Sequence, residues 1–227
     1  MSNQKENVII SLGGSIVVPE KINIEFLMKF KYMILKHLPT KRFFIIIGGG
    51  RTAREYQNAA LVVSSVDDED RDWLGIHATR LNAHLLRTIF KKHAYKRVLK
   101  NPTEKPEFEE DILIAAGWKP GFSTDYDAVL IARNYNAKTI INITNAGFVY
   151  DKDPRKFPEA KPLTKISWKS FRKLVGNKWS PSLNMPFDPV ASRMAEKLKL
   201  KVIITGPDLK NLENILQGRN FTGTIIQ

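Results

Sequence analysis

Short apolar runs alternate with amphipathic segments along the chain, and this alternation is the main guide to the fold. The runs are rich in β-branched residues and are bounded by glycine, proline or polar residues. Runs of this kind are typical of strands that are buried on both faces of a parallel sheet. They predict strands at residues 8–12, 43–47, 112–116, 139–144, 202–205 and 224–226, with a shorter strand at 97–99.

Between these runs, apolar residues recur at the spacing of one helix face. They predict helices at residues 24–38, 51–63, 71–93, 168–175, 190–198 and 209–216, and a further helix after residue 123. The acidic stretch 64–70 and the Pro-rich stretch 101–111 predict breaks, and 176–185 predicts a loop, either over a site or simply on the surface. Strands that alternate with helices predict one compact α/β unit, whose mainly parallel sheet is covered on both faces.

Glycines directly follow the first two predicted strands. Gly13 and Gly14 precede Ser15, and residues 48–50 are three consecutive glycines. Glycine at such a junction lets backbone N–H groups approach a phosphate, and the dipole of the next helix favours the negative charge. Close packing of a helix on a strand also requires glycine, so this structural reading stays open. Neither of the standard nucleotide-binding patterns, GxxxxGK[ST] and GxGxxG, is present.

The stretch 119–154 carries a polar turn on either side of a predicted strand. Before the strand, Gly121 ends an apolar segment, and Ser123, Thr124 and Asp125 can cap the next helix, whose free N–H groups suit a phosphate. Beyond the strand's carboxyl end, where ligands bind in α/β sheets, a second polar turn contains Thr144, Asn145, Gly147, Tyr150, Asp153 and Pro154.

Composition narrows the possible partners. The formal net charge is +13, from 36 Lys and Arg against 23 Asp and Glu, which favours anionic ligands. The basic residues are spread along the chain with no aromatic-studded RNA-binding motif, so nucleic-acid binding is not expected. Cysteine is absent and the four histidines are scattered, so no metal site is expected. The first apolar run is too short for a signal sequence or a membrane span, which predicts a cytoplasmic protein without a membrane partner.

The order of these motifs resembles the amino acid kinase family, and most closely its archaeal-type uridylate (UMP) kinase branch. GGS comes first, then GGG with Arg54 four residues later, then STD and TN…Y..DP. The resemblance runs from residue 9 to the terminal TGTII and includes RDWLGIHATRLNAHLL, similar to that branch's core helix. It implies a three-layer αβα sandwich that phosphorylates UMP with MgATP, with ATP and UMP as its small-molecule partners and a hexamer as its usual assembly.

By position, the resemblance also implies the roles of individual residues. The transferring phosphoryl group would lie along the catalytic residues Gly14 and Ser15, with Arg193 as a cation. The acceptor nucleotide would contact Gly48, Gly49, Gly50, Arg54, Asp72 (at the ribose), Gly121, Ser123, Thr124 and Asp125. ATP would contact Gly13, Gly14, Thr144, Asn145, Tyr150, Asp153 and Asp188. The acceptor part would span about 1–135 and the ATP part about 136–227, and Mg²⁺ would arrive with ATP.

Several of these residues also have a purely structural reading. Arg54 can be a surface arginine, Asp72 a carboxylate in the first turn of a helix, and Thr124 a cap. Tyr150 can belong to the core. The pairs 153–154 and 188–189, both Asp-Pro, suit a turn and a helix start.

The chain departs from the family pattern at the transfer and donor sites. Ser11 stands where many members have a lysine, and Arg193 takes the place of a second lysine. Ala146, Gly147 and Phe148 replace the usual valine, aspartate and glycine, and Lys119 and Arg51 are candidate replacement cations. Two alternatives therefore stay open: a kinase of the same fold for another small phosphate or carboxylate acceptor, and a nucleotide-binding sensor or structural subunit with weakened catalysis.

Overall fold

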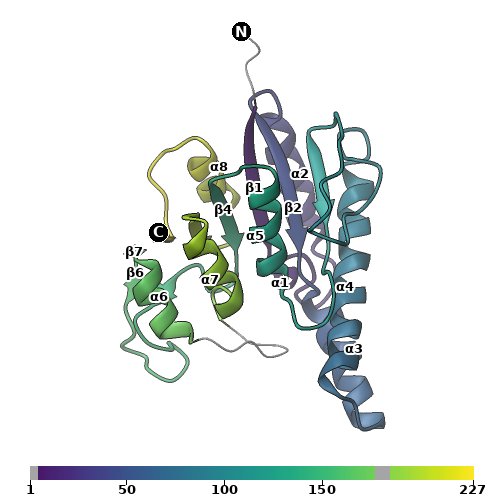
Figure 1. The fold of residues 1–227 in the computed structure, drawn as a ribbon, viewed down its shortest axis with the longest axis vertical. Helices are drawn as coiled ribbons and strands as arrows, with labels where there is room; N and C mark the ends of the chain where they lie inside the picture. Colours follow the sequence, from purple (N-terminus) through teal and green to yellow (C-terminus); the bar gives the residue numbers. More distant parts are fainter. Residues whose placement is uncertain (1–4, 177–184) are drawn as a thin grey trace.

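A seven-stranded sheet forms the centre of the computed structural model, which describes residues 5–176 and 185–227 (Figure 1). The strand order is β3-β2-β1-β4-β8-β9-β7. The bounds are β1 Glu6–Leu12, β2 Lys41–Ile47, β3 Ile112–Ala115, β4 Thr139–Ile143, β8 Lys201–Thr205, β9 Thr224–Ile226 and β7 Lys165–Ile166. All neighbouring strands are parallel except β8 and β9. The predicted mainly parallel sheet is therefore confirmed.

Helices cover both faces of this sheet and make it the middle layer of a three-layer αβα sandwich, as predicted. Their bounds are α1 Gly14–Val17, α2 Ile24–His37, α3 Gly50–Val63, α4 Asp68–Ile89, α5 Thr124–Asn134, α6 Trp168–Val175, α7 Pro189–Lys197 and α8 Leu209–Leu216. One apolar core joins the sheet to α2, α4 and α8, and the other joins it to α5, α6 and α7. In Figure 1, α5 and α7 lie in front of the sheet.

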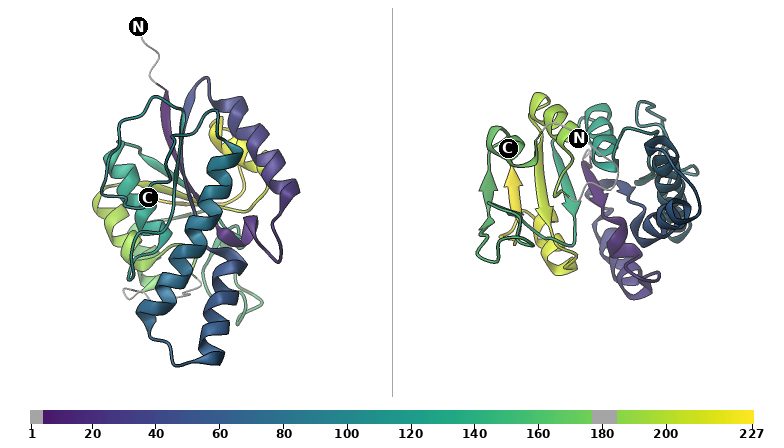
Figure 2. Two further views of the ribbon diagram at one scale, coloured as in Figure 1. Left: turned by 90° about the vertical axis from the view of Figure 1, so that its right-hand side faces the viewer. Right: turned by 90° about the horizontal axis from the view of Figure 1, so that it is seen from below.

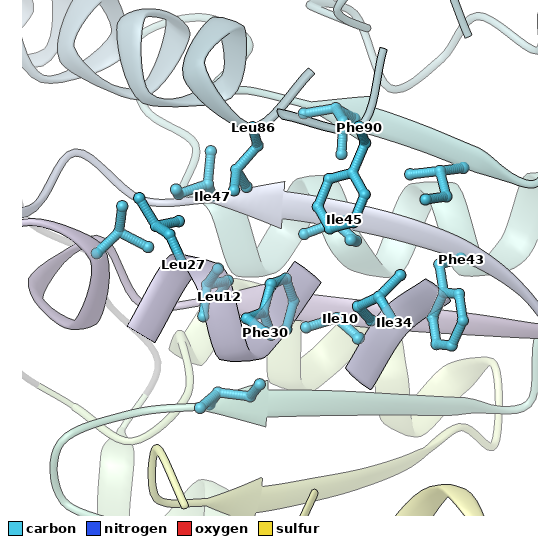
Figure 3. Close-up of a cluster of buried hydrophobic side chains, with 14 of the residues drawn as sticks. Ile10, Leu12, Leu27, Phe30, Ile34, Phe43, Ile45, Ile47, Leu86 and Phe90 are labelled. Carbon is cyan, nitrogen blue, oxygen red and sulfur yellow. The ribbon is translucent and has the colours of Figure 1, made fainter. Parts of the chain in front are cut away.

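The core on the α2 side shows why the apolar runs form strands. Alternate residues of β1 and β2 point into it, and Phe30 from α2 meets Phe90 edge-on at 6.3 Å between ring centres (Figure 3). The intervening residues of the same strands, among them Ile9 and Phe44, fill the opposite core. Burial on both faces explains why these strands read as continuous apolar runs.

The strand register brings the predicted ligand loops together. Leu12 of β1 lies opposite Ile47 of β2 and Ile143 of β4, so these three parallel strands end at the same level. The segments that follow them therefore meet at one edge of the sheet, which is where ligands bind in this class of fold.

Helix α4 corrects one prediction. It starts at Asp68 rather than at residue 71, because Asp67 caps it by accepting a hydrogen bond from the Asp70 N–H at 2.8 Å. The acidic residues that suggested a break form its first turn, where the helix dipole favours negative charge. The helix ends at Ile89, short of the predicted residue 93.

The strand predicted at residues 97–99, beside β3, is also corrected. Residues 97–99 do not form a strand; Leu99 makes only an isolated bridge to Ala115, and Ala94 a second one to Ile112.

The two-residue strand β7 and the small hairpin of β5 (Val149–Tyr150) with β6 (Pro162–Leu163) were not predicted. Most of the loop predicted at 176–185 lies outside the described residues.

Helices α3 and α4 form a hairpin that extends beyond the sheet (Figures 1 and 2). Several of its large apolar side chains are exposed: Tyr56, Leu61, Val62, Val63 and Leu81. Within the described residues, no helix is both long enough and apolar enough to cross a membrane.

Candidate active site

The loops after β1 and β2 pack backbone to backbone. The Gly13 N–H donates to the Ile143 carbonyl at 2.9 Å, and the Gly48 N–H donates to the Leu12 carbonyl at 3.0 Å. A Cβ added to Gly14 would lie 2.2 Å from the Gly50 nitrogen and 2.4 Å from the Gly48 oxygen. No side chain fits there, so the glycines that follow the two strands allow the two loops to touch.

Helix α4 fixes the second loop from the side. The Asn82 side-chain amide donates to the carbonyl oxygens of Gly48 and Gly49, at 2.9 and 3.1 Å. Gly50 has a φ of +64°, in the left-handed region that favours glycine. Asn82 was not predicted from the sequence, although an amide among the apolar residues of a core helix is the kind of signal that identifies such a residue.

Arg54 joins the two glycine loops through its side chain. Its Nη1 atom donates to the Ser15 hydroxyl at 3.5 Å, although the two residues are far apart in sequence. Arg51 is less suited to replace a missing cation, because its Nε atom pairs with Glu55 at 2.6 Å. Lys119 lies 4.2 Å from the ring centre of Trp118, beside the loop that precedes α5. The Arg54 guanidinium therefore lies beside Ser15, where the two glycine loops meet.

The segment before α5 is held from α4. Asp72 Oδ2 accepts a hydrogen bond from the Gly121 N–H at 2.8 Å, so these two predicted acceptor residues contact each other. Burial raises the pKa of the Asp72 carboxyl. Ser123 caps α5 by accepting from the Tyr126 N–H at 3.2 Å, which leaves Thr124 as the first helical residue.

Asp125 is the centre of a polar network that connects both halves of the sheet. Its Oδ1 atom accepts from the Ser11 hydroxyl at 3.0 Å and from the Asn142 amide at 3.3 Å. Its Oδ2 atom accepts from the Asp188 N–H at 3.1 Å. Burial, and then the neighbouring Asp188 carboxylate, raise the pKa of Asp125 to about 7. The position without the family's lysine is thus filled by a hydroxyl that binds a carboxylate.

Asp188 begins α7, as its structural reading predicted. Its Oδ1 atom accepts from the Ala191 N–H at 2.6 Å, and Pro189 occupies the first turn. Burial raises the pKa of Asp188, and hydrogen bonds from the backbone N–H groups of Ala191 and Val190 oppose this effect, with a smaller contribution from the Arg193 guanidinium. Arg193 is exposed on the same helix. The helix start therefore places a carboxyl and a cation next to the Asp125 network.

The turn after β4 is held by hydrogen bonds from its backbone N–H groups and contains a glycine with a positive φ. The Thr144 N–H donates to the Thr205 carbonyl at 2.8 Å, and the Gly147 N–H approaches the Thr144 hydroxyl at 3.4 Å. Gly147 has a φ of +69°, so glycine suits the position where the family has aspartate. Phe148 packs edge-on to Tyr150, with the ring centres 6.4 Å apart. Asn145, between Thr144 and this turn, is exposed.

Asp153 lies in an exposed turn and is already paired. Its carboxylate binds the Arg155 guanidinium with two contacts of 3.0 Å and also accepts from the Arg155 N–H at 3.1 Å. These bonds lower the pKa of Asp153. The turn reading of this residue is therefore satisfied, and its predicted contact with ATP stays a prediction.

Metal ligands are not concentrated anywhere in residues 5–176 and 185–227, where no group of three or more His, Cys, Asp or Glu side chains could hold an ion. Mg²⁺ needs no such group when it binds through nucleotide phosphates and one or two carboxylates. Asp125 already accepts hydrogen bonds at both oxygens, so of the two buried carboxyls Asp188 is the one that would contribute such a contact.

Comparisons with known proteins show the family of the chain. The family model for the amino acid kinase family matches residues 6–206. A protein named uridylate kinase from Pyrococcus abyssi is 34% identical over 222 residues, covering 96% of this chain and 98% of the relative. One of the same name from Thermoplasma volcanium is 33% identical, covering 98% of both chains.

Solved structures give the same result. The crystal structure of uridylate kinase from Archaeoglobus fulgidus superimposes with a TM-score of 0.83 at 30% identity, covering 97% of this chain and 99% of the other. UMP kinase from Ureaplasma parvum, at 20% identity, shares the fold with a TM-score of 0.74, covering 99% of both chains. With the family model matching most of its length, the chain belongs to the amino acid kinase family.

Proposed function

We propose that this protein transfers the γ-phosphate of ATP to UMP, giving UDP. The observation that carries the proposal is the contact between Arg54 and Ser15, which places a guanidinium at the junction of the two glycine loops. A guanidinium there suits the phosphate of an acceptor nucleotide next to the loop along which the phosphoryl group moves. Relatives that match over nearly the full length of the chain are named uridylate kinase.

The chemistry needs positioning and neutralisation of charge more than it needs a base. The phosphate oxygen of UMP attacks the γ-phosphorus in line, the bond from the γ-phosphorus to the β,γ-bridging oxygen breaks, and ADP leaves with no covalent enzyme intermediate. Backbone N–H groups of the glycine loops and the Arg193 guanidinium stabilise the charge that develops. When bound with ATP, Mg²⁺ neutralises part of the phosphate charge.

The two substrates are assigned to different parts of the chain. We assign acceptor binding to residues of about 1–135, which contribute both glycine loops and the start of α5, and ATP binding to about 136–227, which contribute the turn after β4 and the start of α7. The Asp125 network crosses this boundary, because its donors come from β1, β4 and α7. The cytoplasmic location expected from the sequence stays a prediction.

A coupled assay with UMP, CMP, GMP and AMP tests the function. We expect turnover with UMP well above that with the other nucleotides, and none above background in a Ser15→Ala, Arg54→Ala double variant. Turnover of a small non-nucleotide phosphate or carboxylate without turnover of UMP would assign a different acceptor. Tight ATP or UTP binding without any transfer would identify a sensor, for which Ser11, Gly147 and Phe148 are the motivating features.

The single variant Arg54→Ala is expected to raise KM for UMP by about 100-fold and to leave KM for ATP within about threefold, because the guanidinium that it removes binds the acceptor phosphate. Initial-rate kinetics with each substrate varied would measure both constants. Arg51→Ala is the matched control, since Arg51 lies on the same helix but pairs with Glu55. Equal effects of the two variants would contradict the proposed role of Arg54.

We further propose that the protein forms a homohexamer and that the α3–α4 hairpin supplies one of its contacts. Val62 and Val63 are 87% and 85% exposed at the end of α3, and Leu61, in the same turn, is 45% exposed. Clustered exposed apolar residues favour association. Sedimentation should show a smaller assembly for Val62→Asp, whereas Met28→Asp, on exposed apolar surface of α2, should keep the wild-type assembly. An unchanged assembly in Val62→Asp would exclude the hairpin as a contact.

A further inference from the structure

Asp127 is a fully buried carboxyl group that the proposed reaction does not use. It lies on α5 with 0% of its surface exposed. Its Oδ2 atom accepts a hydrogen bond from the Trp118 N–H at 3.2 Å, and its Oδ1 atom has no hydrogen-bond partner within the described part of the chain. Burial raises the pKa of the Asp127 carboxyl well above its ordinary range. Burying a polar atom without a hydrogen-bond partner costs stability, so the hydrogen bond that Asp127 makes with Trp118 indicates a role for the residue.

The segment that Asp127 contacts, Gly117–Gly121, leads from β3 to the start of α5. Within the described residues, its other side-chain hydrogen bonds come from α4. Thr79 accepts from the Gly117 N–H at 2.8 Å, Arg80 donates to the Trp118 carbonyl at 2.9 Å, and Asp72 accepts from the Gly121 N–H at 2.8 Å. Asp127 alone among these contacts reaches the segment from α5. The segment is therefore held between two helices.

Little packing fixes the end of this segment. Gly121 has a φ of +85°, and an added Cβ there would meet no atom within 4 Å. Trp118, in contrast, packs against Phe122 with ring centres 5.2 Å apart, and Phe122 packs against Tyr126 at 4.8 Å. Moving the Trp118 backbone would therefore move the residue directly before the helix cap Ser123. The position of Trp118 therefore affects the position of Phe122 and, through it, the start of α5.

We propose that Asp127 is a positioning residue for the acceptor: by binding the Trp118 N–H, it fixes the segment that presents Gly121, Ser123 and Thr124 to the phosphate of UMP. This role rests on the proposed function and deepens it. A neutral side chain with a carbonyl oxygen suffices for it, because the hydrogen bond needs only an acceptor. Asparagine can therefore replace Asp127, whereas leucine, of similar size, cannot.

Steady-state kinetics of Asp127→Leu and Asp127→Asn test this role. We expect Asp127→Leu to raise KM for UMP by about tenfold while kcat and KM for ATP change by less than about twofold, and Asp127→Asn to stay within about twofold of wild type. The control is Ile131→Val, which weakens the core on the same helix without touching the segment, and it should leave KM unchanged. Equal KM values in Asp127→Leu and wild type would overturn the proposal, as would equal losses in the leucine and asparagine variants.

Hydrogen exchange in the absence of nucleotide gives a readout that does not depend on the substrate. Amides of residues 117–122 should exchange faster in Asp127→Leu than in wild type and Asp127→Asn, and unchanged exchange would overturn the proposal. If the leucine variant does not fold, Thr79→Val removes the acceptor of the Gly117 N–H from the other side and should show the same faster exchange and higher KM. Faster exchange in an enzyme that does not turn over UMP would instead refute the proposed function and support the hold of Asp127 on the segment.

Discussion

Replacing Gly14 by alanine is expected to lower kcat/KM for UMP by about 100-fold or more, because the two glycine loops can no longer touch. The added methyl group would lie 2.2 Å from the Gly50 nitrogen and 2.5 Å from the Gly48 carbonyl carbon, both backbone atoms. One loop must therefore move by a substantial fraction of an ångström. Overpacking of this kind also destabilises proteins by about 1–3 kcal/mol. Kinetics and thermal unfolding measured on the same sample would separate the two effects.

The comparison variant is Gly218→Ala, at the end of α8. Gly218 has a φ of +67° and open space around an added Cβ, so alanine there introduces backbone strain without a clash. We expect it to lower stability by about 1 kcal/mol and to leave kcat/KM unchanged. If Gly14→Ala behaves like Gly218→Ala, close contact of the loops is not needed for activity.

The elements that could be predicted are those whose sequence signal has a local cause. Strands β1 and β2 are buried on both faces, so they read as apolar runs, and the glycines after them mark the approach of one backbone to another. Helix α4 was placed correctly over most of its length, but its start was missed because Asp68 and its acidic neighbours resemble a polar loop. The same residues are favourable in a first turn, and only the cap by Asp67 distinguishes the two cases.

Long-range polar contacts could not be predicted. The contact of Asp125 with the acceptor stays a prediction, and its observed partners Ser11, Asn142 and the Asp188 N–H were not predicted. These residues are distant in sequence, and they meet only because the fold brings β1, β4 and the start of α7 together around α5. Asp127 gave no signal, because a carboxylate on a helix normally indicates the solvent-exposed face. The hairpin of β5 and β6 is too short for any periodic pattern.

The stability of the protein is expected to fall as the pH rises from about 4 to about 7, through Asp125. Burial beside Asp188 raises the pKa of this carboxyl from its ordinary value of 3.8 to about 7. Between these values the folded state holds a proton that the unfolded state has released, so the free energy of unfolding decreases with pH. The full shift corresponds to a contribution of about 4 kcal/mol. The burial of Asp127 and Asp188 shifts their pKa values in the same direction.

Urea unfolding of wild type and Asp125→Asn between pH 2 and 8 would measure this contribution, because the asparagine variant lacks the titrating group. The wild-type curve should fall relative to that of the variant as the pH rises, and parallel curves would refute the assignment. Asp153→Asn provides a control of opposite sign. The Arg155 guanidinium lowers the pKa of Asp153, so the stability from that carboxylate is present at neutral pH and is lost as the pH falls through its lowered pKa. Because Asp153 is exposed to solvent, its effect should be much smaller than that of Asp125.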